Sequence, residues 1–337
     1  MHPLVERILN REVRATARAC RLCDDRLEGH VELLRDLFPH TGKSFIVGVT
    51  GNPGAGKSTT VDRLVEAYRA EKRRVAVVAI DPTSPYSGGA ILGDRIRMQR
   101  HFEDPEVFIR SVATRGALGG LSRSTWDIVR VLEAWGADVV IVETVGVGQD
   151  ELEITRAAHS TLVVMAPGMG DDIQAIKAGI LECADVFAVN KADRDGADAT
   201  IRDLELMLAL GGETFTAGAH SRGHAAGQLD VAKEGAKHAE GVWVPPIVRC
   251  VATKREGITD IVQKLDAHRA WLDTDRGRAH WAMKQAEQLR TFLREALVDA
   301  AIHTLGARVD EAAQRVAARE IDPYTAAAEL VAAFRRG

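Results

Sequence analysis

Residues 51–59 carry the clearest chemistry in the chain, because their types and spacing suit the binding of a nucleotide's phosphates. They follow an apolar run at 45–49, precede an amphipathic stretch and match the pattern G-x-x-x-x-G-K-[ST]. In such a loop, glycines let backbone N–H groups converge on phosphate oxygens, and the start of the next helix favours negative charge. Lys57 is expected to reach the β- and γ-phosphates and is our first candidate catalytic residue. The residues expected to contact phosphate are Gly51, Asn52, Pro53, Gly54, Ala55, Gly56, Lys57, Ser58 and Thr59.

A second motif, Asn190-Lys191-Ala192-Asp193, follows an apolar run at 186–189 and predicts which base is bound. An aspartate at the end of a strand can accept hydrogen bonds from both N1–H and the exocyclic amine of guanine, a pair of donors that adenine lacks. N-K-x-D is the guanine-reading motif of GTPases. We therefore predict that Asn190, Lys191 and Asp193 bind the base of GTP or GDP.

A third segment, residues 251–257, resembles the S-A-x-x-x-G loop whose backbone contacts the guanine carbonyl in GTPases. It follows the apolar run at 247–251. On this similarity we expect Val251, Ala252 and Thr253 to contact the base. Val251 stands where serine is usual, so the pattern is incomplete at that position.

Acidic residues at the ends of apolar runs predict a Mg²⁺ site. Glu143 follows the run at 139–142 and begins E-T-V-G, which corresponds in position to D-x-x-G, where the acid holds Mg²⁺ through water and the glycine, here Gly146, senses the γ-phosphate. Asp81 ends the run at 75–80 and could bind the metal or cap a turn; Asp94 could join it or be a solvated loop acid. The candidate metal ligands are Ser58, Asp81, Asp94 and Glu143.

Taken together, five segments resemble the methylmalonyl-CoA mutase-associated GTPases of the MeaB and ArgK type, a family of P-loop GTPases. The segments are E-T-V-G-V-G-Q, D-P-T-S-P, G-D-R-I-R-M, M-A-P-G-M-G-D-D-I-Q-A-I-K-A-G-I and N-K-A-D. The similarity is dense over residues 44–260 and extends to the flanks by pattern only. It implies that Asp81 and Asp94 are Mg²⁺-linked residues of a first switch and that Glu143 is the acid of a second.

The resemblance also implies partners. Proteins of this family are homodimers joined by C-terminal helices and act as chaperones of an adenosylcobalamin-dependent mutase, methylmalonyl-CoA mutase. They use GTP binding and hydrolysis to gate cofactor loading and to protect the mutase from inactivation. The stretch 168–180 is a further switch in that family, which implies that Asp171, Asp172, Gln174 and Lys177 respond to nucleotide or partner.

Hydrolysis by the isolated chain is expected to be slow. Small GTPases orient the attacking water with a glutamine directly after the glycine of the second switch, and here Val147 occupies that place. We hypothesise that the mutase or the segment around 171–177 completes the site, with Lys177 or a partner's charge against the transferring phosphoryl group. Asp171 and Lys177 therefore join Lys57 and Glu143 as candidate catalytic residues.

The elements that must position these residues follow from hydrophobic patterning. Short Val- and Ile-rich runs separated by helical patterns predict strands of a parallel sheet covered on both faces, at 45–49, 75–80, 107–111, 139–142, 161–165, 186–189 and 247–251. The predicted fold class is therefore α/β, a P-loop NTPase with a mostly parallel sheet. Helical spacing predicts a helical arm over residues 4–38 and a helical tail after 258, in which 281–305 is a helix and Asp322-Pro323 begins the last one.

The resulting domain boundaries are an arm at 1–43, a GTPase domain at 44–262 and a helical dimerisation region at 263–337. Residues 211–243, rich in Gly, Ala and His, show no clear periodicity, so this stretch is either a mobile surface insertion or a segment with short helices.

Composition limits the class of partner. The 337 residues are 46% hydrophobic and 27% charged, with a net charge of −4, which is typical of a globular protein and gives no field to attract nucleic acid or an anionic membrane. The apolar runs are too short to span a bilayer, and the charged N-terminus is unlike a secretory signal. Four cysteines favour the reducing cytoplasm, and we interpret Cys20 and Cys23 as reduced thiols on a helix.

Three other functions stay open. An ATP-dependent kinase of amino-acid transport would need a base site that accepts adenine, which Asp193 argues against. A nickel-inserting metallochaperone GTPase would need a Cys/His site, for which Cys20, Cys23, His220 and His224 are the candidates. A scaffold would bind nucleotide without turning it over.

Overall fold

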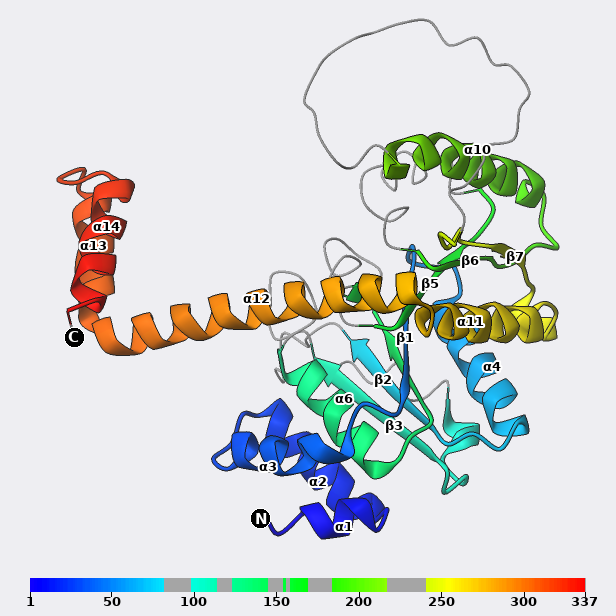
Figure 1. Cartoon of the computed structure of the whole chain (residues 1–337), viewed down its shortest axis with the longest axis horizontal. Coiled ribbons are helices and arrows are strands. Elements are labelled where there is room, and N and C mark those ends of the chain that lie inside the picture. Colours follow the sequence, from blue (N-terminus) through cyan, green and yellow to red (C-terminus); the bar gives the residue numbers. More distant parts are fainter. Residues whose placement is uncertain are drawn as a thin grey trace, which may run out of the picture. The chain divides into compact units, whose positions relative to one another are not determined.

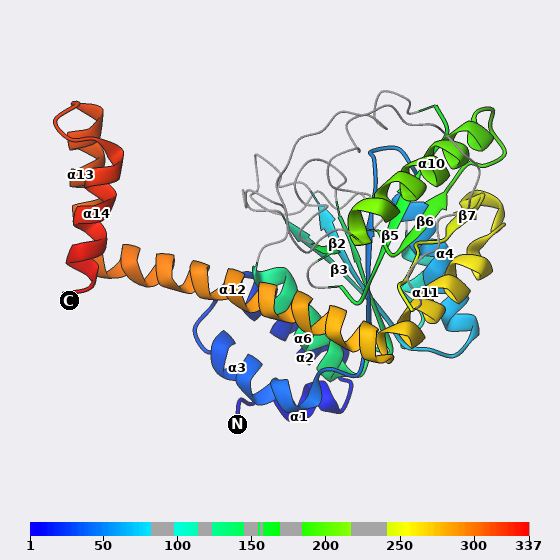
Figure 2. The same ribbon diagram turned by 45° about the horizontal axis from the view of Figure 1, so that its top comes forward.

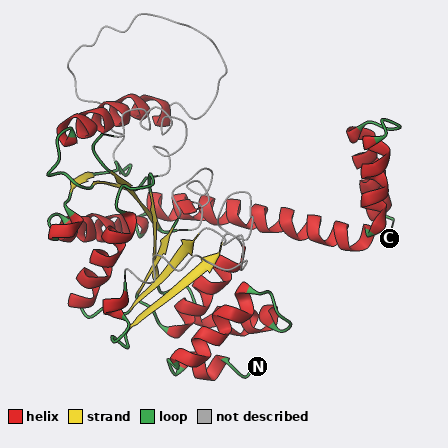
Figure 3. Cartoon of the chain, turned by 180° about the vertical axis from the view of Figure 1, so that it is seen from behind, coloured by secondary structure: helices red, strands yellow, loops and turns green. Residues whose placement is uncertain are grey.

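The computed structural model describes residues 1–81, 98–113, 123–144, 154–155, 158–168, 184–216 and 241–336. In this part of the chain, seven parallel strands form one sheet in the order β3-β2-β4-β1-β5-β6-β7, with helices on both faces (Figures 1 and 3). The strands are β1 (Phe45–Thr50), β2 (Val75–Asp81), β3 (Val107–Ala113), β4 (Val139–Glu143), β5 (Ser160–Met165), β6 (Val186–Val189) and β7 (Ile247–Arg249). Each predicted strand is present, and the α/β P-loop NTPase fold is confirmed.

Alternate residues of the central strands point into separate cores, because successive side chains of a strand face opposite sides of the sheet. Ile46, Val78 and Val140 belong to the core under α6 (Arg123–Trp135) and the N-terminal helices. Val47 and Ile141 belong to the core under α4 (Lys57–Ala70) and α11 (Ile258–Leu272). A smaller core lies between β5, β6 and α10 (Ala197–Thr216). Figure 2 shows α4 and α11 on one side of the sheet and α6 on the other.

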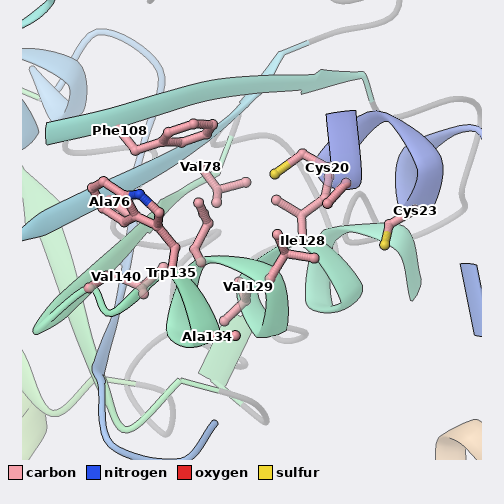
Figure 4. Close-up of a cluster of buried hydrophobic side chains, with 14 of the residues drawn as sticks. Cys20, Cys23, Ala76, Val78, Phe108, Ile128, Val129, Ala134, Trp135 and Val140 are labelled. Atoms are coloured by element: carbon pink, nitrogen blue, oxygen red, sulfur yellow. The ribbon is translucent and has the colours of Figure 1, made fainter. Parts of the chain in front are cut away.

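The predicted arm consists of α1 (Val5–Leu9), α2 (Val13–Asp24) and α3 (His30–Leu37), followed by a short 3₁₀ turn, η1 (Phe38–His40). Helix α2 packs on α6, and Cys20 and Cys23 are buried there among apolar side chains (Figure 4). Both are free thiols on a helix, as predicted. Burial raises the pKa of Cys20 to about 12 and raises that of Cys23 as well.

The sequence left the conformation of residues 211–243 open, and the first six of them are helical. Helix α10 continues to Thr216, although Gly211 and Gly212 are poor helix formers. Its preceding turns are packed on β6 through Ile201 and Leu204, and adding residues to an existing helix is easier than nucleating one. Residues 217–240 lie outside the described part of the chain.

A buried polar network lies at the amino ends of β5 and β6, where sequence analysis gave no signal. The Ser160 hydroxyl lies 2.6 Å from His268 Nδ1, and His268 Nε2 lies 3.3 Å from a carboxylate oxygen of Asp185. The indole of Trp243 donates to the backbone carbonyl of Asp185. Ser160 and His268 are fully buried, so this network ties α11 to the sheet.

Two compact units divide the chain, Met1–Trp281 and Ala282–Gly337. The predicted helical tail is confirmed as α11, α12 (Asp275–Leu305), α13 (Ala307–Ala317) and α14 (Pro323–Phe334). The last helix begins as predicted, since the side chain of Asp322 accepts hydrogen bonds from the N–H groups of Tyr324 and Thr325. Among the described residues, none of the helices combines the length and apolar character needed to cross a membrane.

Candidate functional site

The phosphate loop connects β1 to α4, and its shape depends on two glycines. Gly51 has φ of 131°, and a Cβ atom there would lie 1.9 Å from the carbonyl oxygen of Val164. Gly56 has φ of 95° and immediately precedes α4; a Cβ atom there would lie 2.3 Å from the side-chain nitrogen Nδ2 of Asn190. The first N–H groups of α4 have no acceptor within the helix, so its start suits an anion.

Lys57, the first residue of α4, is buried with its charge held against the loop. Its Nζ donates to the carbonyl oxygens of Gly51 at 2.8 Å and Asn52 at 3.1 Å. These contacts keep the ammonium group beside the loop, where a bound phosphate would replace backbone carbonyls as its acceptor. Pro53 and Gly54 are exposed, whereas Ala55 and Ser58 are buried, so the loop turns its tip to solvent.

The N-K-A-D segment follows β6 and contacts the phosphate loop directly. Asn190 is buried; its Nδ2 donates to the Ala55 carbonyl at 2.8 Å, and its Oδ1 accepts from the Ala252 N–H at 3.0 Å. The next residue, Lys191, donates from Nζ to the Gly54 carbonyl at 2.7 Å. One asparagine side chain therefore joins two segments that the sequence had assigned separately to phosphate and base.

Asp193 lies at the surface of this region with its carboxylate 2.8 Å from Nζ of Lys254. The hydrogen bond from Lys254 lowers the pKa of Asp193, so this carboxylate is an ionised acceptor at neutral pH.

The loop at 251–257 includes the 3₁₀ turn η3 (Ala252–Lys254) and is closed by its backbone. The N–H of Val251 donates to the Glu256 carbonyl at 3.0 Å, while the Val251 side chain is buried. Gly257, with φ of 74°, ends the loop where a Cβ atom would lie 2.1 Å from the Arg249 carbonyl. Thr253 is exposed. The loop therefore forms without the usual serine hydroxyl.

Oxygen ligands suited to Mg²⁺ gather at the carboxyl ends of β2 and β4. The hydroxyl of Ser58 donates to a carboxylate oxygen of Glu143 at 2.7 Å, and both side chains are buried. The buried carboxylate of Asp81 ends β2, whose Ala79 is paired with Glu143. Hydroxyl and carboxylate oxygens are the donors that Mg²⁺ prefers, so these residues fit the ion.

Six residues with predicted roles lie outside the described part of the chain: Asp94, Gly146, Asp171, Asp172, Gln174 and Lys177. Sequence reasoning also missed Arg63, which lies on α4 and donates from Nε to the Ala252 carbonyl at 3.1 Å. No sequence signal marks that contact, because an arginine less than two turns after the phosphate-loop lysine is typical of an ordinary helix surface.

Cys20 and Cys23 gain no support as metal ligands. Within the described ranges, no three side chains of His, Cys, Asp or Glu come together in a way that could hold a metal ion. His220 and His224 fall outside those ranges.

Comparison with known proteins extends these observations. Residues 16–306 match the family model described as methylmalonyl Co-A mutase-associated GTPase MeaB. A putative GTPase of Pyrococcus abyssi is 44% identical over 328 residues, which cover 96% of this chain and 94% of that protein. A mitochondrial methylmalonic aciduria type A homolog of Caenorhabditis elegans is 40% identical over 175 residues, covering 51% of this chain and 44% of that protein. A crystal structure of an LAO/AO transport system kinase has a TM-score of 0.65 and 25% identity, with 98% of this chain and 96% of that chain covered.

Proposed function

The chain belongs to the family of methylmalonyl-CoA mutase-associated GTPases of the MeaB type, and from this premise we propose that it is a GTP-gated chaperone of an adenosylcobalamin-dependent mutase. The proposed client is methylmalonyl-CoA mutase. Its support is the family to which residues 16–306 belong and the name of the relative from Caenorhabditis elegans. In this role, GTP binding and hydrolysis gate the loading of adenosylcobalamin and protect the mutase from inactivation.

The chain is a GTPase and binds guanine nucleotide. We assign the phosphates to residues 51–59 and Gly146, and the base to Asn190, Lys191, Asp193 and the backbone of residues 251–253. The observation that carries this assignment is the pair of hydrogen bonds from the Asn190 side chain to Ala55 and Ala252. Because one buried side chain links both segments, phosphates and base can be bound by one continuous surface.

We assign Mg²⁺ to Ser58 and Glu143, with Asp81 and Asp94 as further ligands, directly or through water. The contact between Ser58 and Glu143 supports the first pair. When bound, the ion would neutralise charge on the phosphate oxygens. Lys57 would hold the β- and γ-phosphates from the start of α4, and Glu143 would keep the Ser58 hydroxyl oriented.

The isolated chain should turn over slowly, and the mutase should accelerate it. Val147 cannot orient water, and we propose that Lys177 and Asp171, or a charge from the mutase, supply what is missing. We place the protein in the cytoplasm, because the buried free thiols of Cys20 and Cys23 suit a reducing compartment.

The proposed assembly is a homodimer formed through the C-terminal helices. Leu289, Leu293 and Leu297 recur every four residues on α12, and more than half of each side chain is exposed. An apolar stripe of this kind is typical of a helix that pairs with another. Replacing Leu293 with Glu should convert the dimer to a monomer in sedimentation; a wild-type chain that is monomeric at micromolar concentration contradicts the assembly.

A steady-state GTPase assay with purified adenosylcobalamin-dependent methylmalonyl-CoA mutase tests the function. We expect saturating mutase to raise the turnover of the wild type at least about 10-fold, in line with completion of an unfinished phosphoryl-transfer site. The Lys57→Ala variant is the control and should stay near background. An unchanged rate, together with failure of the two proteins to co-purify with GDP or a non-hydrolysable GTP analogue, overturns the proposal. ATP hydrolysis as fast as GTP hydrolysis would instead favour a kinase.

A further inference from the structure

The backbone of Ala252 is held at both its polar groups, from two different elements. Its N–H donates to Asn190 Oδ1 at 3.0 Å, and its carbonyl accepts from Nε of Arg63 at 3.1 Å. Arg63 lies on α4, the helix that begins with the phosphate-loop lysine. The loop proposed to meet the base is therefore fixed to the same helix that begins at the phosphate site.

Glu66, one turn further along α4, orients the arginine. Its Oε2 accepts from Nη1 of Arg63 at 3.0 Å and from Nε of Arg255 at 3.1 Å, and its Oε1 lies 2.7 Å from Nη2 of Arg255. Arg100 adds a contact at 3.4 Å. Burial alone would raise the pKa of Glu66, but these guanidinium groups more than offset that effect and lower the pKa, so the Glu66 carboxylate is ionised at neutral pH.

Together, Arg63 and Glu66 hold the loop at two separate points. One is the carbonyl of Ala252, and the other is the side chain of Arg255, whose backbone has a positive φ of 64°. Val251 has no hydroxyl with which to form further bonds inside the loop. The contacts from α4 therefore supply a restraint that the loop's own side chain at that position cannot give.

We infer that Arg63, oriented by Glu66, is a positioning residue for guanine recognition. It holds the Ala252 backbone and thereby places the next N–H, that of Thr253, for the carbonyl oxygen of guanine, because the N–H groups of Val251 and Ala252 are engaged within the protein. Arg63 itself touches no part of the nucleotide. This inference rests on the proposed assignment of residues 251–253 to the base. Its consequence is selective: loss of Arg63 weakens recognition of the base and leaves the phosphate contacts unchanged.

Calorimetric titration of Arg63→Ala with GDP and with ADP, each with Mg²⁺, tests this selectivity. ADP shares the ribose and phosphates of GDP but lacks the carbonyl group. We expect the affinity for GDP to fall about 10-fold, the loss that follows from misplacing one hydrogen-bonding group, while the affinity for ADP stays the same. Glu66→Gln keeps the side chain's shape and should reduce the GDP to ADP affinity ratio in the same direction.

Arg69→Ala is the matched control. Arg69 lies on the same helix with 20% of its side chain exposed against 18% for Arg63, but it pairs with Asp104 and not with the loop. This variant should keep the wild-type ratio. Equal losses for GDP and ADP in Arg63→Ala, or a ratio unchanged in both Arg63→Ala and Glu66→Gln, overturn the inference. A wild type that binds ADP as tightly as GDP overturns the proposed base site instead.

Discussion

Replacing Asn190 with alanine removes a side chain that bonds both to the phosphate loop and to the base loop. The wild-type amide donates to the Ala55 carbonyl at 2.8 Å and accepts from the Ala252 N–H at 3.0 Å. Ala55, Asn190 and Ala252 are all buried, so water cannot readily take the place of the lost amide. The substitution therefore leaves two buried backbone groups without a partner.

The expected cost follows from those two groups. A buried polar group that loses its partner destabilises a protein by about 1–3 kcal/mol, so the pair should lower the free energy of unfolding by about 2–6 kcal/mol. A typical domain is stable by about 5–15 kcal/mol, so the variant should fold but with a large part of its stability lost. Binding of GDP should weaken as well, because the phosphate loop and the base loop are no longer held at a fixed position relative to each other.

Urea denaturation without nucleotide, monitored by circular dichroism, measures the loss of unfolding free energy. Calorimetry with GDP measures the weaker binding. Asn10→Ala is the control, since Asn10 is exposed at the end of α1 and should change stability by less than about 0.5 kcal/mol. An Asn190→Ala variant that is as stable as Asn10→Ala would refute the reasoning, because the two hydrogen bonds would then contribute nothing to the fold.

Three further predictions concern the core and its ionisable groups. Trp135→Ala should lower the free energy of unfolding by about 3–5 kcal/mol in urea titrations, because the side chain is fully buried and its ring packs against that of Phe108. In a Cys183→Ser background, the three remaining thiols of Cys20, Cys23 and Cys250 should react with a thiol reagent at pH 8 only after unfolding, since burial raises all three pKa values; rapid reaction of the native protein contradicts this. Burial would raise the pKa of Asp62, but hydrogen bonds from a histidine and an arginine lower it overall, so its contribution to stability is present above about pH 4 and lost in more acidic solution. The stability gap between wild type and Asp62→Asn should therefore close as the pH falls; a gap that persists at pH 2 argues against this.

The sheet could be predicted because its strands are short, apolar on both faces and separated by helical patterns. Runs such as 139–142 are too short and too uniformly apolar for an amphipathic helix, so they could be predicted as buried strands. The phosphate loop was equally accessible, since its glycines, lysine and serine follow one another at fixed spacing within residues 51–58. These features are local in sequence, which is why spacing was enough to find them.

Contacts between distant segments could not be predicted in the same way. The hydrogen bonds of Arg63 to Ala252 and of Ser160 to His268 join residues far apart in sequence, and their partners are fixed only by the packing of α4 and α11 on the sheet. The end of α10 could not be assigned from the sequence for a related reason. Two consecutive glycines argue against a helix on intrinsic propensity, but tertiary packing overrides a preference of about 1 kcal/mol for each residue.

The measurement that tests the central claim most directly is the base preference of Asp193→Asn. Xanthine carries a carbonyl where guanine carries its exocyclic amine, so an aspartate that reads guanine should repel xanthine, whereas asparagine can donate to that carbonyl. Titration calorimetry should show the wild type binding GDP at least about 100-fold more tightly than xanthosine diphosphate, and Asp193→Asn should reverse the order. If the variant keeps the wild-type preference for GDP, Asp193 does not read the base, and the site described for this chain is wrong.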